Sequence, residues 1–286
     1  MNNYETTLRH QVVINGVRTP VLESGPQESA EAVVFVHGNP GAGADWAGLV
    51  AAVGSFTRAL APDMPGFGRA DKPNDFPYTV PGYAAHLGAL IDTMGLRRVH
   101  LVLHDFGGPW GLSWAAQRPE MLASMTLINT GVLPGYRWHY MARLWRTPGI
   151  GELVQAMTTR ASARLLLKHG NPRGLPRDFI DRMYDDYDAA TRRAVLRLYR
   201  ATPHLGGLAR EWSSILRPLD VPALVIWGAR DPYIGVEYAP RQREAFPSAE
   251  IVVLPDSGHW PYADNPIAVR DTLVPFLERQ QPGAGA

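Results

Sequence analysis

An aspartate at a sharp strand-to-helix turn is the feature that most constrains this chain. In the run 101–110, LVLHDFGGPW, an apolar strand ends at Asp105 and a glycine-rich helix start follows at once. Such a turn holds its central side chain at the edge of a helix-flanked sheet, where serine is the usual attacking group. A carboxylate that attacks saturated carbon leaves an ester of its own side chain, which water can hydrolyse. Asp105 therefore predicts displacement at an sp³ carbon, with a helix N-cap aspartate as the structural alternative.

Apolar runs and helical patterns alternate along most of the chain, which predicts an α/β fold with a mostly parallel sheet. Strands are expected over residues 32–36, 57–61, 99–103, 125–128, 223–227 and 250–254. Helices are expected over residues 83–94, 109–117, 237–244 and 266–279. Residues 12–21 are typical of an opening hairpin, because Asn15-Gly16 is a strong turn pair.

The alternation stops between about residues 131 and 212, where helical spacing continues without a strand-like run. This segment predicts an inserted helical cap over the sheet. The expected organisation is a first core part over 1–130, a cap over 131–215, a second core part over 216–280 and a disordered tail over 281–286.

Composition narrows the class of protein. The 286 residues are 45% hydrophobic and 19% charged, as in ordinary globular enzymes. The net charge of +1 gives no electrostatic reason to expect nucleic acid or an anionic membrane as a partner. Cysteine is absent, which excludes disulfides and thiolate chemistry. With no signal peptide, membrane-length run or phosphate-binding loop visible, we expect a cytoplasmic monomer or homodimer without cofactor or metal.

Two further chemistry-bearing residues follow expected strands. Asp231 lies in the run 227–232, WGARDP, and His259 lies in the run 256–260, DSGHW. The carboxyl ends of parallel strands meet at one edge of a sheet, so Asp105, Asp231 and His259 are expected to lie together there. Taken singly, Asp231 is also compatible with a turn residue and His259 with a structural histidine. Their order along the chain is that of a nucleophile–acid–histidine triad.

Nearly the whole chain, residues 11–279, resembles the α/β-hydrolase superfamily, and within it the epoxide hydrolase and haloalkane dehalogenase branch. The run 37–40, HGNP, resembles the family's HGxP oxyanion loop, and the run 63–68, DMPGFG, resembles its DxPGxG turn. The run 103–108 matches the elbow that carries an aspartate nucleophile. These motifs specify the fold and the aspartate branch more strongly than they specify the reaction.

The resemblance implies a reaction in two steps. Asp105 attacks the substrate carbon and forms an ester, and His259, oriented by Asp231, then activates the water that hydrolyses it. The backbone N–H groups of Asn39 and Phe106 are expected to stabilise the oxyanion of the second step. The wider oxyanion and substrate-binding region is expected to include His37, Trp110 and Trp145.

The leaving group separates two candidate reactions. An epoxide oxygen needs an O–H donor, which lid tyrosines supply in epoxide hydrolases. Tyr199-Arg200 resembles the tyrosine–arginine pair of that lid, at a similar distance before Asp231 (231 − 199 = 32 residues). Tyr140 is expected as the second donor, with Tyr136 as the alternative at that position. For each of these tyrosines, packing on the core is the structural alternative.

A halide instead needs N–H donors around an anion that is never protonated. Asn39 matches the position of the amide that many dehalogenases use, and the run 144–153 is similar to their first lid helix. Phe106 departs from their pattern, because dehalogenases normally place tryptophan directly after the nucleophile. An indole from elsewhere, such as Trp110, Trp138 or Trp145, would have to replace that N–H.

We therefore expect a hydrolase that opens a small hydrophobic epoxide to a vicinal diol. Haloalkane dehalogenation by the same triad is the alternative reaction, and a hydrolase-fold receptor without turnover is the alternative of another class. A receptor would be favoured if Asp105→Ala bound a ligand as well as the parent and the parent never turned it over. The roof of the pocket is expected to include Met141, Leu144, Trp145, Ile150 and Leu153.

Overall fold

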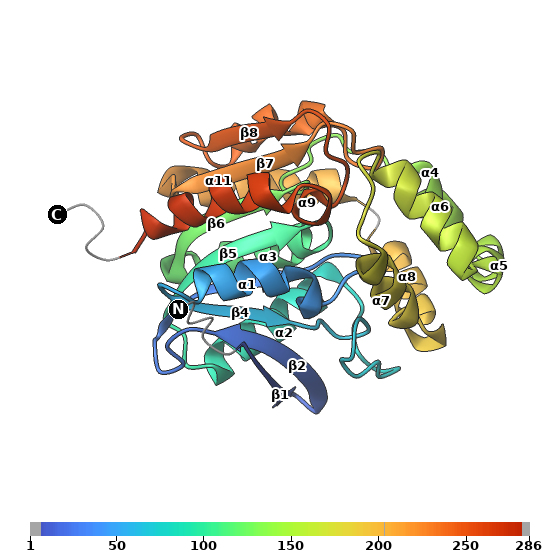
Figure 1. Cartoon of the computed structure of the whole chain (residues 1–286), viewed down its shortest axis with the longest axis horizontal. Coiled ribbons are helices and arrows are strands. Elements are labelled where there is room, and N and C mark those ends of the chain that lie inside the picture. Colours follow the sequence, from blue (N-terminus) through green and yellow to red (C-terminus); the bar gives the residue numbers. More distant parts are fainter. Residues whose placement is uncertain (1–6, 203, 282–286) are drawn as a thin grey trace.

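An eight-stranded sheet forms the middle layer of the computed structural model, which describes residues 7–202 and 204–281 (Figure 1). The strand order is β1-β2-β4-β3-β5-β6-β7-β8, antiparallel for the first two pairings and parallel for the others. The strands are β1 (Leu8–Ile14), β2 (Val17–Ser24), β3 (Glu31–Val36), β4 (Arg58–Pro62), β5 (Arg98–His104), β6 (Leu122–Ile128), β7 (Ala223–Gly228) and β8 (Glu250–Leu254). The predicted α/β fold with a mostly parallel sheet is confirmed.

The opening hairpin turns where the sequence predicts. Asn15 and Gly16 both have positive φ, 49° and 81°, as a two-residue hairpin turn requires. Strand β1 pairs with β2 and closes the sheet on that side. Residues 282–286 of the tail that was expected to be disordered lie outside the described residues.

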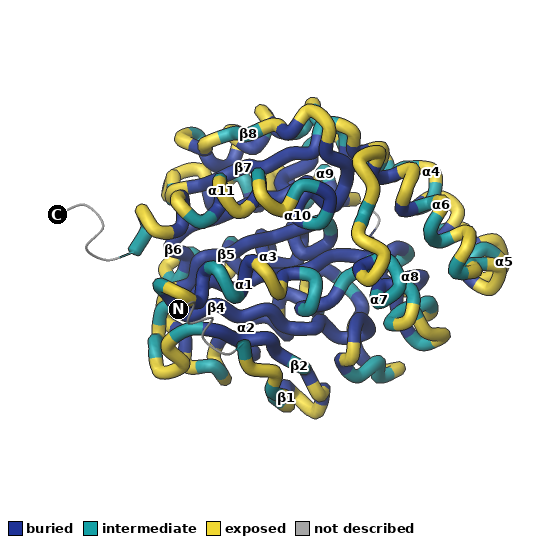
Figure 2. The backbone as a smooth tube through the Cα atoms, viewed as in Figure 1, coloured by how far each residue is buried: buried dark blue, intermediate teal, exposed yellow. Residues whose placement is uncertain are grey.

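Side chains of the central strands alternate between two hydrophobic layers. In β3, Val34 and Val36 join the layer built by α2 (Val80–Thr93) and α3 (Gly107–Gln117). Val33 and Phe35 join the layer built by α1 (Ala47–Val53) and α11 (Pro266–Glu278). This alternation is expected for strands that are buried on both faces. Figure 2 shows the sheet buried throughout its centre, with exposed residues on the outer sides of the helices, on the edge strands β1 and β8 and in the loops.

Between β6 and β7, all regular secondary-structure elements that the structure describes are helices. They are α4 (Tyr140–Arg146), α5 (Ile150–Met157), α6 (Arg160–Gly170), α7 (Arg177–Asp185), α8 (Ala189–Ala201) and α9 (Leu205–Leu216). Helices α4 to α8, here called the helical insert, lie together at one end of the sheet (Figure 1). Helix α9 packs instead against α3, beside the sheet.

The helix expected over residues 237–244 is only two short 3₁₀ segments, η4 (Val236–Tyr238) and η5 (Pro240–Glu244). Pro240 accounts for the break, because a proline has no N–H to continue the helical hydrogen bonds. The remaining short elements are η1 (Gly43–Trp46), η2 (Pro119–Met121), η3 (Arg217–Leu219) and α10 (Pro261–Asp264). Within the described residues, no helix has the length and apolar character needed to cross a membrane.

Candidate active site

Asp105 sits in a left-handed turn between β5 and α3, with φ of 48°. This conformation is uncommon for a residue with a Cβ atom and marks a position where the backbone is strained. The turn is possible because glycines follow it. A Cβ atom at Gly107 would lie 2.2 Å from the carbonyl oxygen of Val36, and one at Gly108 would lie 2.0 Å from Thr130 Oγ1. The glycine-rich helix start therefore lets α3 approach the sheet closely while Asp105 points away from it.

The two carboxylate oxygens of Asp105 have different surroundings. Oδ1 accepts a hydrogen bond from the backbone N–H of Asn39 at 2.7 Å. Oδ2 lies 3.5 Å from Nε2 of His259. The backbone N–H of Phe106, at the start of α3, donates to no acceptor within residues 7–202 and 204–281. One oxygen is thus held by a loop N–H, while the other faces the imidazole.

Behind the imidazole, Asp231 fixes the orientation of His259. Its Oδ2 lies 2.7 Å from Nδ1 of His259, and its Oδ1 accepts hydrogen bonds from the backbone N–H groups of Tyr233 and Ile234. Asn129 Nδ2 donates to Oδ2 of Asp231 at 2.8 Å, and Asn129 Oδ1 accepts from Gly228 N–H. Each hydrogen bond that the Asp231 carboxylate accepts therefore comes from a donor that the surrounding structure holds in place.

Charges within this row of residues determine their protonation. Burial alone would raise the pKa of Asp105, but the hydrogen bond and charge of His259 outweigh it and lower that pKa to about 2. Burial alone would lower the pKa of His259, but the charge of Asp231 and the bond to Asp105 raise it to about 10. The resting site therefore holds an imidazolium between two carboxylates.

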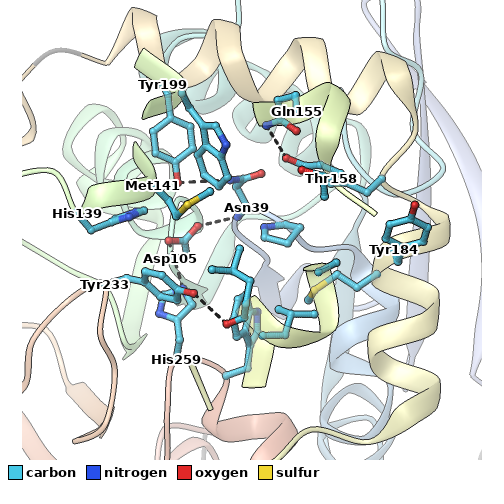
Figure 3. Close-up of a pocket in the computed structure, with 18 residues that line it drawn as sticks. Asn39, Asp105, His139, Met141, Gln155, Thr158, Tyr184, Tyr199, Tyr233 and His259 are labelled. Carbon is cyan, nitrogen blue, oxygen red and sulfur yellow. Dashed lines mark hydrogen bonds and ion pairs between the residues drawn. The ribbon is translucent and has the colours of Figure 1, made fainter. Parts of the chain in front are cut away.

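A cavity that is partly open to solvent lies between the sheet edge and the helical insert (Figure 3). Asp105 and His259 line it on the side of the sheet, and Tyr199 of α8 lines it on the side of the insert. Most of the wall is apolar or aromatic, with Pro40, Met141, Trp145, Leu166, Leu167, Met183 and Trp260. Such a wall favours a hydrophobic substrate.

Tyr199, the expected lid donor, lines the same cavity as Asp105. It is 2% exposed, and its hydroxyl lies 3.4 Å from Nδ2 of Asn39. Burial, together with the charge of Asp105, raises the pKa of Tyr199 well above its ordinary value. Tyr199 therefore remains a neutral O–H donor at the cavity wall.

Several sequence predictions need correction. Tyr140 is 41% exposed and does not line the cavity; its ring lies near those of His139 and His169. Trp110 stacks on Tyr83 at 4.1 Å between ring centroids and does not line the cavity either. His37 is fully buried, and its Nε2 accepts from Met64 N–H, so its visible role is to brace the loop.

Of the expected roof residues, Met141 and Trp145 line the cavity, one turn apart on α4. The other three are exposed and do not line it: Leu144, Ile150 and Leu153. Phe106 lines a smaller neighbouring cavity that also reaches Asp105, with its ring against Trp138 and Tyr199.

The structure also brings forward residues that the sequence predictions did not single out. Tyr233, two positions after Asp231, lines the cavity, and its ring lies 5.1 Å from that of His259. His139 lines the same cavity, and burial lowers its pKa to about 4, which keeps it neutral. Tyr233 had a usable signal, since it follows a strand end that already carries a triad member. His139 follows no strand end, and it stands among the aromatic residues of segment 136–140, so nothing in the sequence distinguishes it.

Comparison with known proteins agrees with this fold. Residues 31–266 match the family described as alpha/beta hydrolase fold. The chain belongs to this family. A cis-3-alkyl-4-alkyloxetan-2-one decarboxylase of Xanthomonas campestris is 28% identical over 96% of this chain and 97% of that protein. A haloalkane dehalogenase of Mesorhizobium japonicum is 26% identical over 94% of this chain and 91% of that protein. The structure of the epoxide hydrolase CorEH aligns with a TM-score of 0.80 at 18% identity, covering 96% of this chain and 100% of that one.

Proposed function

We propose that this hydrolase opens a small apolar epoxide to a vicinal diol through an ester on Asp105. The observation that carries the proposal is the pair of groups on opposite walls of one apolar cavity. On one wall is the ionised carboxylate of Asp105, and on the other is the neutral hydroxyl of Tyr199. A carboxylate and an O–H donor facing each other suit an attack on ring carbon with protonation of the ring oxygen.

In the first step, Oδ2 of Asp105 attacks a ring carbon and the bond from that carbon to the ring oxygen breaks. Oδ1 stays on the Asn39 N–H, which holds the carboxylate in position. Tyr199 donates a proton to the departing oxygen, so that a hydroxyalkyl ester forms. This half-reaction takes up one proton overall. The ester also removes the negative charge of Asp105, so the pKa of His259 falls and its imidazolium can supply that proton.

In the second step, the neutral imidazole of His259 takes a proton from water, and the hydroxide attacks the ester carbonyl of Asp105. The negative charge that develops on Oδ1 meets the N–H groups of Asn39 and Phe106. Collapse of this intermediate releases the diol and restores the carboxylate. His259 regains its proton in this half-reaction, so the proton balance of the cycle closes.

A second candidate is opening of a four-membered oxetanone ring. The supporting observation is the 28% identity to an oxetanone decarboxylase over 96% of this chain. Both substrate classes are strained oxygen rings whose opening leaves negative oxygen, and Tyr199 can serve either. The release of CO₂ and alkene would distinguish this reaction from diol formation.

Haloalkane dehalogenation is less well supported by the site, although a dehalogenase is 26% identical. A halide needs N–H donors from more than one side. The Asn39 amide supplies one, but Phe106 supplies no side-chain donor, and the Trp110 indole nitrogen is buried outside the cavity. Of the tryptophans considered as replacements, Trp145 lines this cavity, and its indole would have to supply the second donor.

The deciding experiment uses His259→Gln. The variant should still form the ester, because Tyr199 donates the proton and solvent in the partly open cavity can replace it, but it should fail to hydrolyse the ester. The variant is incubated separately with an aryl epoxide, a bromoalkane and an oxetanone, and the intact protein is weighed. An epoxide adduct adds the whole substrate mass, whereas a bromoalkane adduct adds only the alkyl group. The parent enzyme is assayed in parallel for diol, bromide and CO₂. An adduct and diol with the epoxide are expected. Bromide or CO₂ without diol would overturn the epoxide proposal, and a parent that binds these ligands without turnover would point to a receptor.

A further inference from the structure

Gln155, at the end of α5, is a buried amide in the cavity wall with half of its hydrogen-bonding capacity unused. Its side-chain Nε2 donates to the hydroxyl of Tyr187 at 2.9 Å. Its Oε1 is buried and accepts no hydrogen bond from any residue that the structure describes. Gln155 as a whole is only 3% exposed. Buried polar atoms usually have a hydrogen-bond partner, and this carbonyl, in a residue that lines the cavity, is available to accept a hydrogen bond from a ligand there.

Tyr187 is the second member of this polar site, here called the Gln155–Tyr187 pair. Its hydroxyl accepts from Gln155 and donates to no other side chain or backbone group within the described ranges. Burial raises the pKa of Tyr187 to about 12, so the hydroxyl keeps its proton. Gln155 and Tyr187 both line the cavity. An unused acceptor and an unused O–H donor therefore lie side by side in its wall.

The local backbone holds this pair in place. Arg192 of α8 donates to the backbone carbonyl of Gln155 at 2.6 Å and to that of Thr158 at 3.1 Å. Its guanidinium also lies 5.8 Å from the ring centroid of Tyr187. Thr158 does not add a free group, because its hydroxyl donates to Val154 O. The Gln155–Tyr187 pair is thus held in place by the helical insert.

The Gln155–Tyr187 pair lies at a distance from Asp105, and this determines which part of a substrate it can contact. Figure 3 shows Gln155 and Thr158 across the cavity from Asp105 and His259. The wall between them is largely apolar. A molecule with its reacting carbon at Asp105 would lay an apolar body along the cavity and bring its far end to Gln155.

We propose that the substrate carries a hydroxyl group at the end opposite its reactive ring, and that Gln155 and Tyr187 bind this hydroxyl. A hydroxyl donates to Gln155 Oε1 and accepts from Tyr187, which satisfies both unused groups. It fits equally if the amide is turned over, because Nε2 then donates to it while Tyr187 donates to Oε1. The identity of the reactive end rests on the proposed function, but the hydroxyl site itself does not.

The test measures binding of unreactive ligands by calorimetry. Primary alkanols of increasing chain length are compared with their methyl ethers, which cannot donate a hydrogen bond. At the best chain length the alkanol should bind about tenfold more tightly than the ether, as expected for one buried hydrogen bond. Gln155→Leu and the closer isostere Gln155→Met should each abolish this preference. Thr158→Val, a neighbouring change in the same wall, should keep it.

Equal binding of alkanol and ether by the parent would overturn the proposal, as would a preference that persists in folded Gln155→Met. Turnover separates this result from the proposed function. Epoxides with a terminal hydroxyl or a terminal methyl ether are compared by kcat/KM in the parent. Turnover of both without preference removes the hydroxyl site and leaves epoxide opening intact. A binding preference for alkanols without epoxide turnover supports the hydroxyl site and removes epoxide opening.

Discussion

The side-chain amide of Asn39 and the hydroxyl of Tyr199 meet across the boundary between the sheet and the helical insert, 3.4 Å apart. Asn39 also holds Asp105 through its backbone N–H. One loop residue therefore contacts the carboxylate with its backbone and the facing hydroxyl with its side chain. The relative position of the proposed nucleophile and the proposed proton donor depends on this loop and on how α8 packs over it.

Tyr199→Phe separates ring opening from halide displacement. Loss of the O–H donor should lower kcat for an epoxide by about 100-fold or more, the usual scale for a general acid. A bromoalkane needs no proton on its leaving group, so any bromide release should change little. Steady-state rates of both reactions check this. If the two rates fall together, the Tyr199 hydroxyl acts by holding the Asn39 amide rather than by donating a proton.

The charge of His259 predicts how stability depends on pH. Its pKa in the folded protein, about 10, lies above the ordinary value of 6.5. The stabilisation is therefore fully present below pH 6.5 and is lost as the pH rises towards 10. In Asp105→Asn one of the two carboxylates beside His259 is gone, so the pKa of His259 falls. The pH range over which this stabilisation is lost therefore becomes narrower.

Urea unfolding of the parent and of Asp105→Asn across this range checks the sign. The free energy of unfolding of the parent should decrease more steeply between pH 6.5 and 10 than that of the variant. His259→Gln serves as the control, because it lacks the titrating imidazole. Identical slopes in all three proteins would show that His259 is not held as an imidazolium.

Asn129→Ala should slow hydrolysis of the ester more than its formation. Asn129 donates to Oδ2 of Asp231 and accepts from Gly228 N–H, and both groups are buried. Losing these bonds should cost about 10- to 100-fold in the hydrolytic step. Rapid-quench kinetics with an epoxide should then show the ester accumulating. Ser124→Ala, at the far end of the same strand β6, removes a buried bond to His100 and should not produce a burst.

The central features of the site could be predicted because they follow from strand topology. Asp105 comes directly after β5, and Asp231 and His259 lie in the loops that follow β7 and β8. Parallel strands bring their carboxyl ends to one edge of the sheet. The side-chain pattern of β5 and the glycines after it were enough to place Asp105 at the turn between strand and helix. Geometry then adds the details, such as the separate partners of the two Asp105 oxygens.

The insert could not be predicted to the same depth. An amphipathic helix shows which residues share a face, but not what that face covers once several helices pack together. Tyr140 and Tyr199 both fit a donor, yet Tyr199 is 2% exposed at the cavity and Tyr140 is 41% exposed outside it. Gln155 had no signal at all, since a lone glutamine in a helix is ordinarily a surface residue.

The ion pair between Arg182 and Asp45 predicts how firmly the insert is attached. Arg182 of α7 donates to the carboxylate of Asp45 at 2.8 Å, and the Asp45 side chain is only 2% exposed. Burial raises the pKa of Asp45, and Arg182 opposes that shift. Arg182→Met would leave the carboxylate buried without its partner, which should destabilise the protein by about 2–3 kcal/mol. Thermal unfolding should show a Tm lower by about 5 °C or more.

Arg177→Met is the matched control on the same helix. Arg177 is 84% exposed and lies 3.7 Å from Asp181, so its removal should leave Tm within about 1 °C. The double variant Arg182→Met with Asp45→Asn should recover much of the lost stability, because the uncompensated charge is removed. Equal Tm values for the two single variants would show that α7 is held by apolar packing alone. Recovery in the double variant would instead show that the buried charge of Asp45 makes Arg182 necessary.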